Sequence, residues 1–569
     1  MASPIDSRPT AAAALFLGLT VVATYPIVLA PGSYAFFSHA DAQLNMWIMA
    51  WGAHALAHQP FHLLDANIFA PEPRTLLYSE TLIGYAPIFA PILWLGGSPA
   101  LANNAVLFFS FTASGTAMYL LARHLTGRHW PAIAAGIAYA FVPYRFVHIP
   151  QIQLTAFEWM PLAFLCLHLF VERGDVKYAI GLGAAAAMEA FCCVYYSVFL
   201  AIALAAGGVV LFITDARMRA RRALTTLAIV GCGTLLIVSP LVAAYVRVHR
   251  VRGLTRTIEE IAERSASAGT YFSSSARAHQ WLWGQLLLSP RDYLFPGILA
   301  LSLAAVALAA VVARRRGSSL FPGDPRVVLI YVTVGIVGLV ASFGPHGIGG
   351  VSLYQPLSAS LPILHGLRQT TRFGVLVIFS VSVLAAFGAA VVEPSLRRAS
   401  RYAPALLATA MFLEVLVAPV RTDRPKGDAL VRIPDVPPVY RWLADQPGTF
   451  AIVELPYAPE HQLWQNASYV YWSTVHWHGV VDAYSGFASP DYRSLTRILD
   501  QFPDELSRQA LLQRHVLYVV VHHGRYQAWN RPLNYARIER TPWLTRVAQF
   551  PDVEVLRVDP DARLLTDAR

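Results

Sequence analysis

The chain carries little charge for its length. Of its 569 residues, 14% are charged and 56% are hydrophobic. A soluble protein of this size needs a more polar surface, and here many apolar runs reach the roughly 18–20 residues needed to cross hydrocarbon. The composition therefore argues against an ordinary soluble enzyme and predicts an α-helical polytopic membrane protein.

Cysteine is scarce, and several familiar catalytic motifs are missing. The four cysteines all lie within apolar runs, so no disulfide framework is expected. The sequence has no G-x-x-x-x-G-K-[ST], no H-E-x-x-H and no G-x-S-x-G at a plausible elbow. The histidine pairs His476/His478 and His522/His523 lack a third ligand at metal spacing. We therefore expect no cofactor, and nothing in the sequence supports a bound divalent metal.

Basic residues outnumber acidic ones, with 44 Lys and Arg against 34 Asp and Glu and a net charge of +10. Such an excess could indicate nucleic-acid binding. The arginines, however, lie in short clusters between apolar runs and fall on alternate loops, as the positive-inside rule describes. This pattern predicts the lipid bilayer, and no nucleic acid, as a partner. It also predicts a cytoplasmic N-terminus.

The apolar runs predict about eleven spans, and the first is interpreted as a retained span because no small-residue cleavage site follows it. The predicted spans are 11–30, 101–122, 130–148, 151–172, 177–193, 194–213, 223–246, 294–313, 326–343, 373–392 and 403–420. The apolar stretch 81–97 is assigned as a re-entrant or interfacial segment. If this stretch crossed the membrane, every later arginine cluster would lie on the extracytoplasmic side. Pro87 and Pro91 within the stretch also favour an irregular backbone.

Residues 421–569 differ in character, because their apolar runs are short and charges of both signs appear. The predicted strands are Phe450–Leu455, Val516–Val521 and an edge strand at Val553–Val558, and the predicted helices are Val439–Ala444 and Tyr492–Leu512. The expected organisation is a membrane domain at 1–420, with an outer loop 31–100 that carries interfacial helices. A small extracytoplasmic α/β domain follows at 421–569.

Two carboxylates lie where the chain leaves the bilayer. Asp41 follows the first apolar run, and Glu80 precedes the re-entrant segment. Carboxylates near hydrocarbon cost about 2.5–3.5 kcal/mol at a helix centre, so they are usually kept for chemistry or ion pathways. A carboxylate can take a proton from an acceptor hydroxyl. We predict that Asp41 is a general base, with Glu80 as a competing candidate that could instead orient the acceptor.

Other polar side chains near the same membrane face are candidates for substrate binding. Arg368 and Arg372, at the outer end of the tenth span, could hold phosphate oxygens in bidentate fashion. Arg145 and His148 end the third span, and Tyr78, Tyr195 and Tyr196 could line a sugar or isoprenoid path. Structural ion pairs and ordinary interfacial aromatics remain the alternative explanations.

One arginine cluster, between Arg247 and Arg256, falls outside the membrane in this topology and so breaks the positive-inside rule. Two explanations remain open. These arginines could pair with Glu259, Glu260 and Glu263 of the same loop, or they could bind an anionic substrate.

The order of these features resembles the GT-C superfamily of polytopic glycosyltransferases, which includes aminoarabinose and mannosyl transferases and oligosaccharyltransferases. The resemblance rests on Asp41 after the first span, on Tyr78-Ser-Glu80 before a re-entrant stretch, and on spans ending in Leu120–Gly127 and in Ala140-Phe-Val-Pro-Tyr144. The C-terminal segment Val481-Asp-Ala-Tyr-Ser-Gly486 is similar to that of uncharacterised bacterial membrane proteins, to which no activity can be attached.

The resemblance implies an outward-facing cavity and a lipid-phosphate sugar donor. The family's first-loop aspartate matches Asp41, and its acidic residue before the re-entrant stretch matches Glu80. In the aminoarabinose transferases a lysine follows, whereas here the next residue is Thr81, so phosphate binding falls to arginines or the donor differs. Arg145 and His148 occupy the place of the family's second acidic motif, which leaves metal dependence open.

The predicted function is transfer of a sugar from a polyprenyl-phosphate donor to a glycan, lipid or protein acceptor on the extracytoplasmic face. A lipid or glycan transporter is an alternative, but it would place charges along a through-path, and here the charges cluster near one face. A non-catalytic scaffold that presents the C-terminal domain is the third interpretation. Nothing in the sequence alone excludes it.

Overall fold

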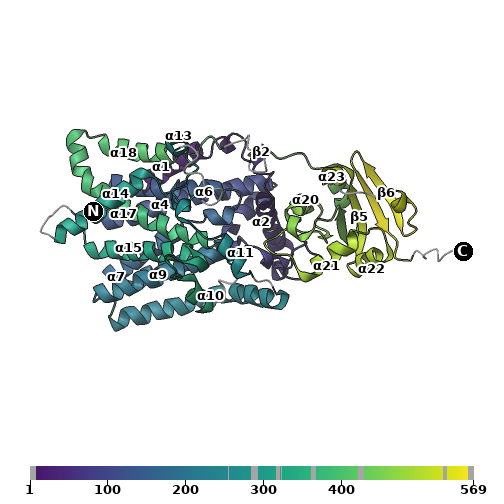
Figure 1. Ribbon diagram of the computed structural model, residues 1–569, viewed down its shortest axis with the longest axis horizontal. Helices are drawn as coiled ribbons and strands as arrows, with labels where there is room; N and C mark the ends of the chain where they lie inside the picture. The colour runs from purple at the N-terminus through teal and green to yellow at the C-terminus, as the bar shows by residue number, and fades with distance from the viewer. Residues whose placement is uncertain are drawn as a thin grey trace. The chain divides into compact units, whose positions relative to one another are not determined.

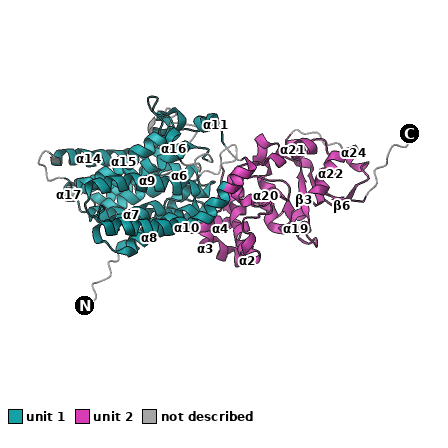
Figure 2. Cartoon of the chain, turned by 90° about the horizontal axis from the view of Figure 1, so that it is seen from below, with its two compact units in different colours: residues 1–30, 104–246, 255–421 teal, residues 31–103, 247–254, 422–569 magenta. Residues whose placement is uncertain are grey.

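The computed structural model describes residues 8–253, 256–283, 293–315, 321, 323–360, 367–420, 429–529 and 535–561. The chain divides into two compact units, drawn in different colours in Figure 2. Unit 1 comprises residues 1–30, 104–246 and 255–421, and unit 2 comprises residues 31–103, 247–254 and 422–569.

Unit 1 is built from helices, and each predicted span corresponds to one of them. These helices are α1 (Arg8–Ala23), α4 (Pro99–Thr126), α5 (His129–Ala140), α7 (Trp159–Arg173), α8 (Val176–Cys192), α9 (Val194–Thr214), α10 (Arg221–Arg252), α14 (Ile298–Arg315), α15 (Pro325–Ser342), α17 (Gly374–Ala399) and α18 (Ala403–Val415). Shorter helices connect them: α6 (Pro143–Val147), α11 (Ile258–Glu263), α12 (Ala268–Tyr271), α13 (Arg277–Trp283) and α16 (Tyr354–Ser360).

Among the described residues, six helical segments are long and apolar enough to cross a membrane: Pro99–Thr126, Ile152–Arg173, Val194–Thr214, Arg221–Arg252, Pro325–Ser342 and Thr370–Ala399. The chain is therefore a multi-pass membrane protein, while the number of eleven spans stays a prediction. The predicted span 130–148 is interrupted, because α5 ends at Ala140 and Pro143, which has no amide hydrogen, begins a separate short helix.

Helix α10 illustrates why this unit needs lipid. No residue of its most apolar window is buried inside the protein, and Ile229, Leu235 and Leu236 are each at least 70% exposed. A helix that presents large aliphatic side chains to its surroundings over this length is stable only if hydrocarbon covers them. This helix also continues past the predicted end of its span at 246 and includes Arg247, Arg250 and Arg252.

Helix α17 lies at the centre of unit 1 and packs against α5, α14 and α15. Small residues allow its backbone to come close to its neighbours. A Cβ atom built on Gly388 would lie 1.8 Å from the carbonyl oxygen of Leu303 in α14. Close approach at small residues is the usual basis of helix packing in membranes, where there is no hydrophobic effect between helices.

Unit 2 contains a five-stranded sheet in the order β4-β3-β5-β7-β6. Its strands are β3 (Ala451–Leu455), β4 (Gly479–Val480), β5 (Val516–His522), β6 (Leu544–Phe550) and β7 (Val553–Val558). Strand β3 pairs in parallel with β4 and β5, whereas β7 pairs antiparallel with β5 and β6. Around it lie α19 (Pro438–Ala444), α20 (Ala467–His476), α21 (Pro490–Leu499), α22 (Glu505–Gln513), α23 (His523–Ala528) and α24 (Tyr535–Glu539) (Figure 1).

The outer loop folds together with this sheet. Strand β1 (Tyr34–Ala35) pairs with β2 (Val431–Arg432), and Ile68 forms a parallel bridge with Val480. Helix α2 (Ala40–His58) packs against α20, and one hydrophobic core contains Phe37 and Met46 from the loop. The compact unit thus combines residues 31–103 with the C-terminal region, whereas the sequence placed the outer loop with the membrane domain.

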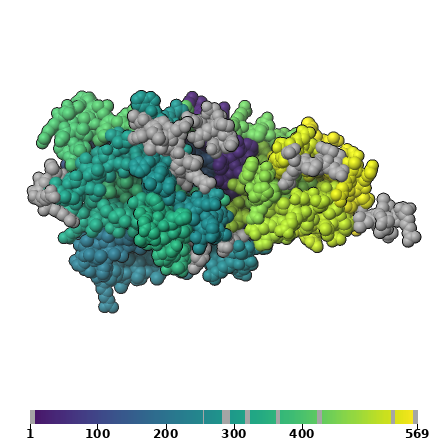
Figure 3. Space-filling view, in the orientation of Figure 1, coloured from purple at the N-terminus to yellow at the C-terminus, as the bar shows by residue number. Residues whose placement is uncertain are grey.

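Two details of the predicted C-terminal region were wrong. Strand β7 lies between β5 and β6, so the edge strand is β6, which was not predicted. Most side chains of β6 are partly or fully exposed, and an edge strand of this kind lacks the apolar run that marks a buried strand. The predicted helix 492–512 is two helices, α21 and α22, because Pro503 lies between them. In the space-filling view, the yellow and yellow-green residues of the C-terminal region pack together (Figure 3).

The stretch assigned as re-entrant or interfacial contains one α-helix, α3 (Ala86–Trp94), of nine residues. Nine residues rise about 14 Å, well short of a hydrocarbon core of about 30 Å. Helix α3 packs against α2, and Trp94 donates a hydrogen bond to the carbonyl of Ala53 over 2.9 Å. Its length agrees with a segment that does not cross the membrane.

The close contact at Gly388 generates a prediction about the packing of α14 and α17. Gly388→Ala should lower the free energy of unfolding by about 1–3 kcal/mol, because the new methyl group meets backbone that cannot rotate away. Thermal unfolding of the purified protein in detergent, with fluorescence-detected size exclusion, measures the effect. The matched control is Gly231→Ala in α10, where a Cβ atom meets nothing within 4 Å. Equal behaviour of the two variants would contradict the packing argument.

Candidate functional site

Asp41 lies in the first turn of α2 in unit 2. Its backbone amide donates to Nδ1 of His39 over 3.1 Å, and its carboxylate accepts a hydrogen bond from the hydroxyl of Tyr484. A negative side chain is stabilised at a helix N-terminus. The side chain is half-buried, so it is both oriented by the protein and accessible from solvent. These properties suit a group that must exchange a proton.

Glu80 and Tyr78, the other predicted site residues of this loop, are buried. Glu80 is 6% exposed and Tyr78 is 1% exposed. The Tyr78 hydroxyl donates to Glu72 over 2.5 Å. Burial and the neighbouring Glu72 carboxylate raise the pKa of Tyr78 well above its ordinary value, so the phenol stays protonated and donates.

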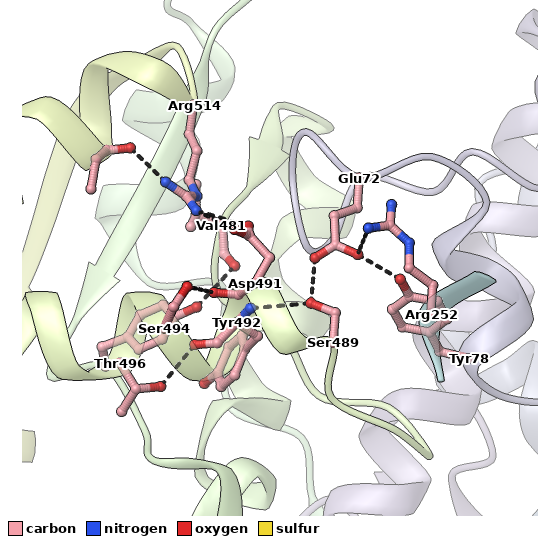
Figure 4. Close-up of polar contacts among 12 residues, drawn as sticks. Glu72, Tyr78, Arg252, Val481, Ser489, Asp491, Tyr492, Ser494, Thr496 and Arg514 are labelled. Carbon is pink, nitrogen blue, oxygen red and sulfur yellow. Dashed lines mark hydrogen bonds and ion pairs between the residues drawn. The ribbon is translucent and has the colours of Figure 1, made fainter. Parts of the chain in front are cut away.

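Glu72 connects three parts of unit 2 (Figure 4). Besides the Tyr78 hydroxyl, its carboxylate accepts a hydrogen bond from the hydroxyl of Ser489 and forms an ion pair with Arg252 at 3.6 Å. Ser489 also caps α21, where it accepts from the backbone amide of Tyr492 over 3.1 Å. A buried carboxylate with this many partners is a structural tie.

Glu72 was not among the residues selected from the sequence. It stands between two prolines, Pro71 and Pro73, in a loop with no periodic pattern, and its partners Arg252 and Ser489 lie far away in the chain.

The arginine cluster between Arg247 and Arg256, for which the sequence left two explanations open, also has a partner that the sequence did not indicate. Arg256 pairs with Glu260 of the same loop at 3.3 Å, whereas Arg252 pairs with Glu72. The local pairing explanation thus holds for Arg256, and Arg252 has a partner that neither explanation included.

Three arginines gather in unit 1. Arg368 donates to Oε1 of Glu260 over 2.8 Å, and Arg256 pairs with the same oxygen. The guanidinium of Arg372 lies 5.0 Å from the ring centroid of Tyr195. Burial has the largest effect on the pKa of Arg256 and lowers it. Glu260 and Tyr195 raise this pKa, and the nearby Arg368 lowers it. Because guanidinium groups present paired donors that suit anionic oxygens, this cluster is a candidate for binding an anionic ligand.

Exposure differs within the cluster. Arg372, in the short 3₁₀ turn η9 (Thr370–Phe373), is 7% exposed, whereas the Arg368 side chain is 43% exposed. Tyr196, one of the tyrosines predicted to line a substrate path, is buried and donates to the carbonyl of Leu154 over 2.9 Å. Its neighbour Tyr195, predicted with it, is half-buried and contacts Arg372. A substrate contact for either tyrosine stays a prediction.

Arg145 is fully buried in unit 1. Its guanidinium donates to the carbonyls of Ala140 and Thr155 at 2.7 and 2.6 Å and lies 3.8 Å from the ring centroid of Phe111. His148 is also buried, and its Nδ1 lies 2.9 Å from Oε1 of Gln151. A substrate contact for both residues stays a prediction, but these bonds favour a structural role.

Glu414, another ionisable residue within a predicted span, has a structural position. Its carboxylate accepts from the backbone amide of Leu299 at 3.1 Å, at the start of α14, and lies 2.9 Å from Nε2 of His279. The carboxylate therefore satisfies helix-end donors that have no partner inside the helix.

No group of three or more His, Cys, Asp or Glu side chains in the described ranges is arranged to hold a metal ion.

Comparison with known proteins identifies the fold. No family model and no curated protein matches the chain in sequence. A solved structure of the arabinofuranosyltransferase AftD from Mycobacteria is similar over 98% of this chain, with a TM-score of 0.59 and 16% identity. The oligosaccharyltransferase of Archaeoglobus fulgidus in its apo form is similar over 92% of this chain, with a TM-score of 0.50 and 12% identity.

The chain thus has the fold of the GT-C glycosyltransferases, as its resemblance predicted. It spans 40% of the length of the arabinofuranosyltransferase and 70% of the length of the oligosaccharyltransferase. Identities this low establish the fold and leave the reaction to be argued from the residues of this chain.

The contacts of Glu72 predict that it holds the segment 481–489 in place. Glu72→Gln removes the charge and one strong acceptor, so the local free energy of opening should fall by about 1.5–3 kcal/mol. Hydrogen exchange of the intact protein should report faster exchange at residues 481–489. Glu460→Gln is the matched control, since Glu460 and its partner Arg493 are both about half exposed and such pairs contribute about 0–1 kcal/mol. Unchanged exchange in Glu72→Gln would rule out the tie.

Proposed function

We propose that this chain is a membrane glycosyltransferase that moves a sugar from a polyprenyl-phosphate donor to an acceptor on the extracytoplasmic face. The observation that carries the proposal is Asp41, a half-buried and oriented carboxylate at the start of α2 in a chain with the GT-C fold. In this proposal the N-terminus lies in the cytoplasm of a bacterial cell, and the C-terminal region lies outside the inner membrane. The acceptor is a glycan, a lipid or a protein.

In the proposed reaction, Asp41 takes the proton of the acceptor hydroxyl while the oxygen of that hydroxyl attacks the anomeric carbon of the sugar. The bond between that carbon and the phosphate oxygen breaks, and polyprenyl phosphate leaves with the electron pair. Asp41 later releases the proton to water. Partial exposure supports Asp41 over the buried Glu80 for this proton exchange.

The phosphate of the donor is assigned to Arg368 and Arg372, with Arg256 beside them. Guanidinium groups present paired N–H donors that match phosphate oxygens. The Glu260 carboxylate holds Arg368 and Arg256 through a single oxygen, which keeps the two guanidinium groups close together. The positive charge of these side chains favours a phosphate as the ligand.

A test of the base is Asp41→Asn, which keeps the size of the side chain but cannot accept the proton. The rate of transfer should fall by about 10²–10⁴-fold. Native mass spectrometry of lipid that co-purifies with the protein first identifies the donor. The assay then incubates purified protein with synthetic polyprenyl-phospho-hexoses and polyprenyl-phospho-pentoses and measures the released polyprenyl phosphate. Asp65→Asn in the same loop is the control for loss of a carboxylate. Near wild-type turnover in a well-folded Asp41→Asn protein would remove Asp41 from the mechanism, and a large loss in Glu80→Gln alone would transfer the role to Glu80.

A test of donor binding replaces Arg368 or Arg372 by lysine. Lysine keeps the charge but loses the planar pair of donors, so affinity for polyprenyl phosphate should weaken about tenfold. Binding of fluorescently labelled polyprenyl phosphate to detergent-purified protein measures this. Arg493→Lys, at an exposed arginine of unit 2, is the control. If both variants bind as tightly as the wild type, these arginines do not hold the phosphate.

A further inference from the structure

The segment 481–489 follows β4 and carries the motif Val481-Asp-Ala-Tyr-Ser-Gly486, to which no activity can be attached by resemblance. It is fixed at both ends within unit 2. At one end the buried Asp482 accepts a hydrogen bond from the backbone amide of Glu454 in β3. At the other end the buried Ser489 donates to Glu72.

Further contacts hold the middle of the segment. The carbonyl of Ala483 accepts from the side-chain amide of Asn466 over 3.0 Å. Gly486 lies so close to the outer loop that a Cβ atom would be 2.7 Å from the carbonyl oxygen of Tyr78. The ring of Phe487 packs edge-on against His249 with 4.9 Å between centroids. The backbone that carries Tyr484 is therefore constrained from both sides.

From this segment the Tyr484 hydroxyl reaches Asp41 and donates a hydrogen bond to its carboxylate. We propose that Tyr484 is a positioning residue of the transfer reaction, which fixes the rotation of the Asp41 carboxylate and so aims it at the acceptor hydroxyl. The inference rests on the proposed function, because it assumes that Asp41 is the base.

The physical reason is the freedom of an aspartate side chain. Two torsion angles place its oxygens, and the oxygen of a general base must lie within about 2.6–3.2 Å of the oxygen whose proton it removes. Displacement of a catalytic group by about 1 Å can cost about 10²-fold in rate. One hydrogen bond from a phenol on a fixed backbone segment limits these torsions.

A purely structural role is the competing explanation, since the same bond also ties the C-terminal region to α2. The two explanations differ in what they predict for Tyr484→Phe. Loss of positioning lowers kcat and leaves the melting temperature and the donor KM unchanged, because donor binding is assigned to Arg368 and Arg372. Loss of a structural tie lowers thermal stability and raises hydrogen exchange in unit 2.

The experiment measures kcat, donor KM and the melting temperature of Tyr484→Phe in the full-length protein, with the synthetic polyprenyl-phospho-sugar that serves as donor for the wild type. We expect kcat to fall at least tenfold, with KM and melting temperature unchanged. Tyr178→Phe is the matched control, because Tyr178 accepts a hydrogen bond from Arg173 in unit 1 over 2.7 Å and should not affect transfer. A kcat within twofold of the wild type overturns the inference, and so does a loss of kcat that accompanies a lower melting temperature.

A second variant moves the phenol without removing it. Gly486→Ala places a methyl group against the Tyr78 carbonyl and shifts the segment, so kcat should again fall while the hydroxyl is still present. In the Asp41→Asn background, Tyr484→Phe should change the residual rate less than twofold, because there is no base left to position. If Asp41→Asn is fully active, Asp41 is not the base, and both that assignment and this inference fail; if Asp41→Asn is inactive and Tyr484→Phe is fully active, only this inference fails.

Discussion

The hydrophobic core that the outer loop shares with the C-terminal region is the constraint on which the rest of unit 2 depends. Phe37 contacts the rings of Tyr471 and Trp472 of α20 at centroid distances of 4.8 and 5.9 Å. Met46 of α2 belongs to the same buried cluster. Because burial of apolar area is the largest favourable term in folding, this core fixes α2 against α20, and Asp41 at the start of α2 takes its position from it.

Much of the fold follows from the sequence because apolar length and arginine placement are local signals. Each predicted span has a helix, and the short α3 lies where an interfacial segment was expected. The carboxylate at Asp41 was also selected locally, from its place after an apolar run. Such signals need only a window of about 20 residues, which is the length over which hydrocarbon imposes its requirement.

The partners of the site residues could not be predicted in this way. Tyr484 and Asp41 are separated by 443 positions, and Ser489 and Glu72 by 417. No periodicity relates such pairs, since only the packed tertiary structure brings them together. The sequence likewise could not separate Tyr195 from Tyr196: both lie at the start of α9, and the turn of the helix decides which ring is buried.

The arginines illustrate how burial separates structural from functional charge. Arg145 is satisfied by backbone carbonyls, a serine hydroxyl and an aromatic face, so its charge costs less inside the protein. Arg368 keeps a large part of its side chain exposed and shares one carboxylate oxygen with Arg256. An exposed guanidinium can contact an anion from solution, whereas the fully buried guanidinium of Arg145 is not accessible to one.

The anchor of the segment 481–489 is itself energetically costly. Asp482 is fully buried beside Glu454, whose carboxylate accepts from Tyr440 and lies 2.7 Å from Nε2 of His522. Burial, with a smaller contribution from the Glu454 charge, raises the pKa of Asp482 well above its ordinary value, so this group keeps a proton over a wider pH range than an exposed aspartate. Apolar residues of similar size would avoid this cost but could not accept the hydrogen bond that the backbone amide of Glu454 donates. The polar anchor fixes the direction in which the chain leaves β4, and that direction decides whether Tyr484 reaches α2.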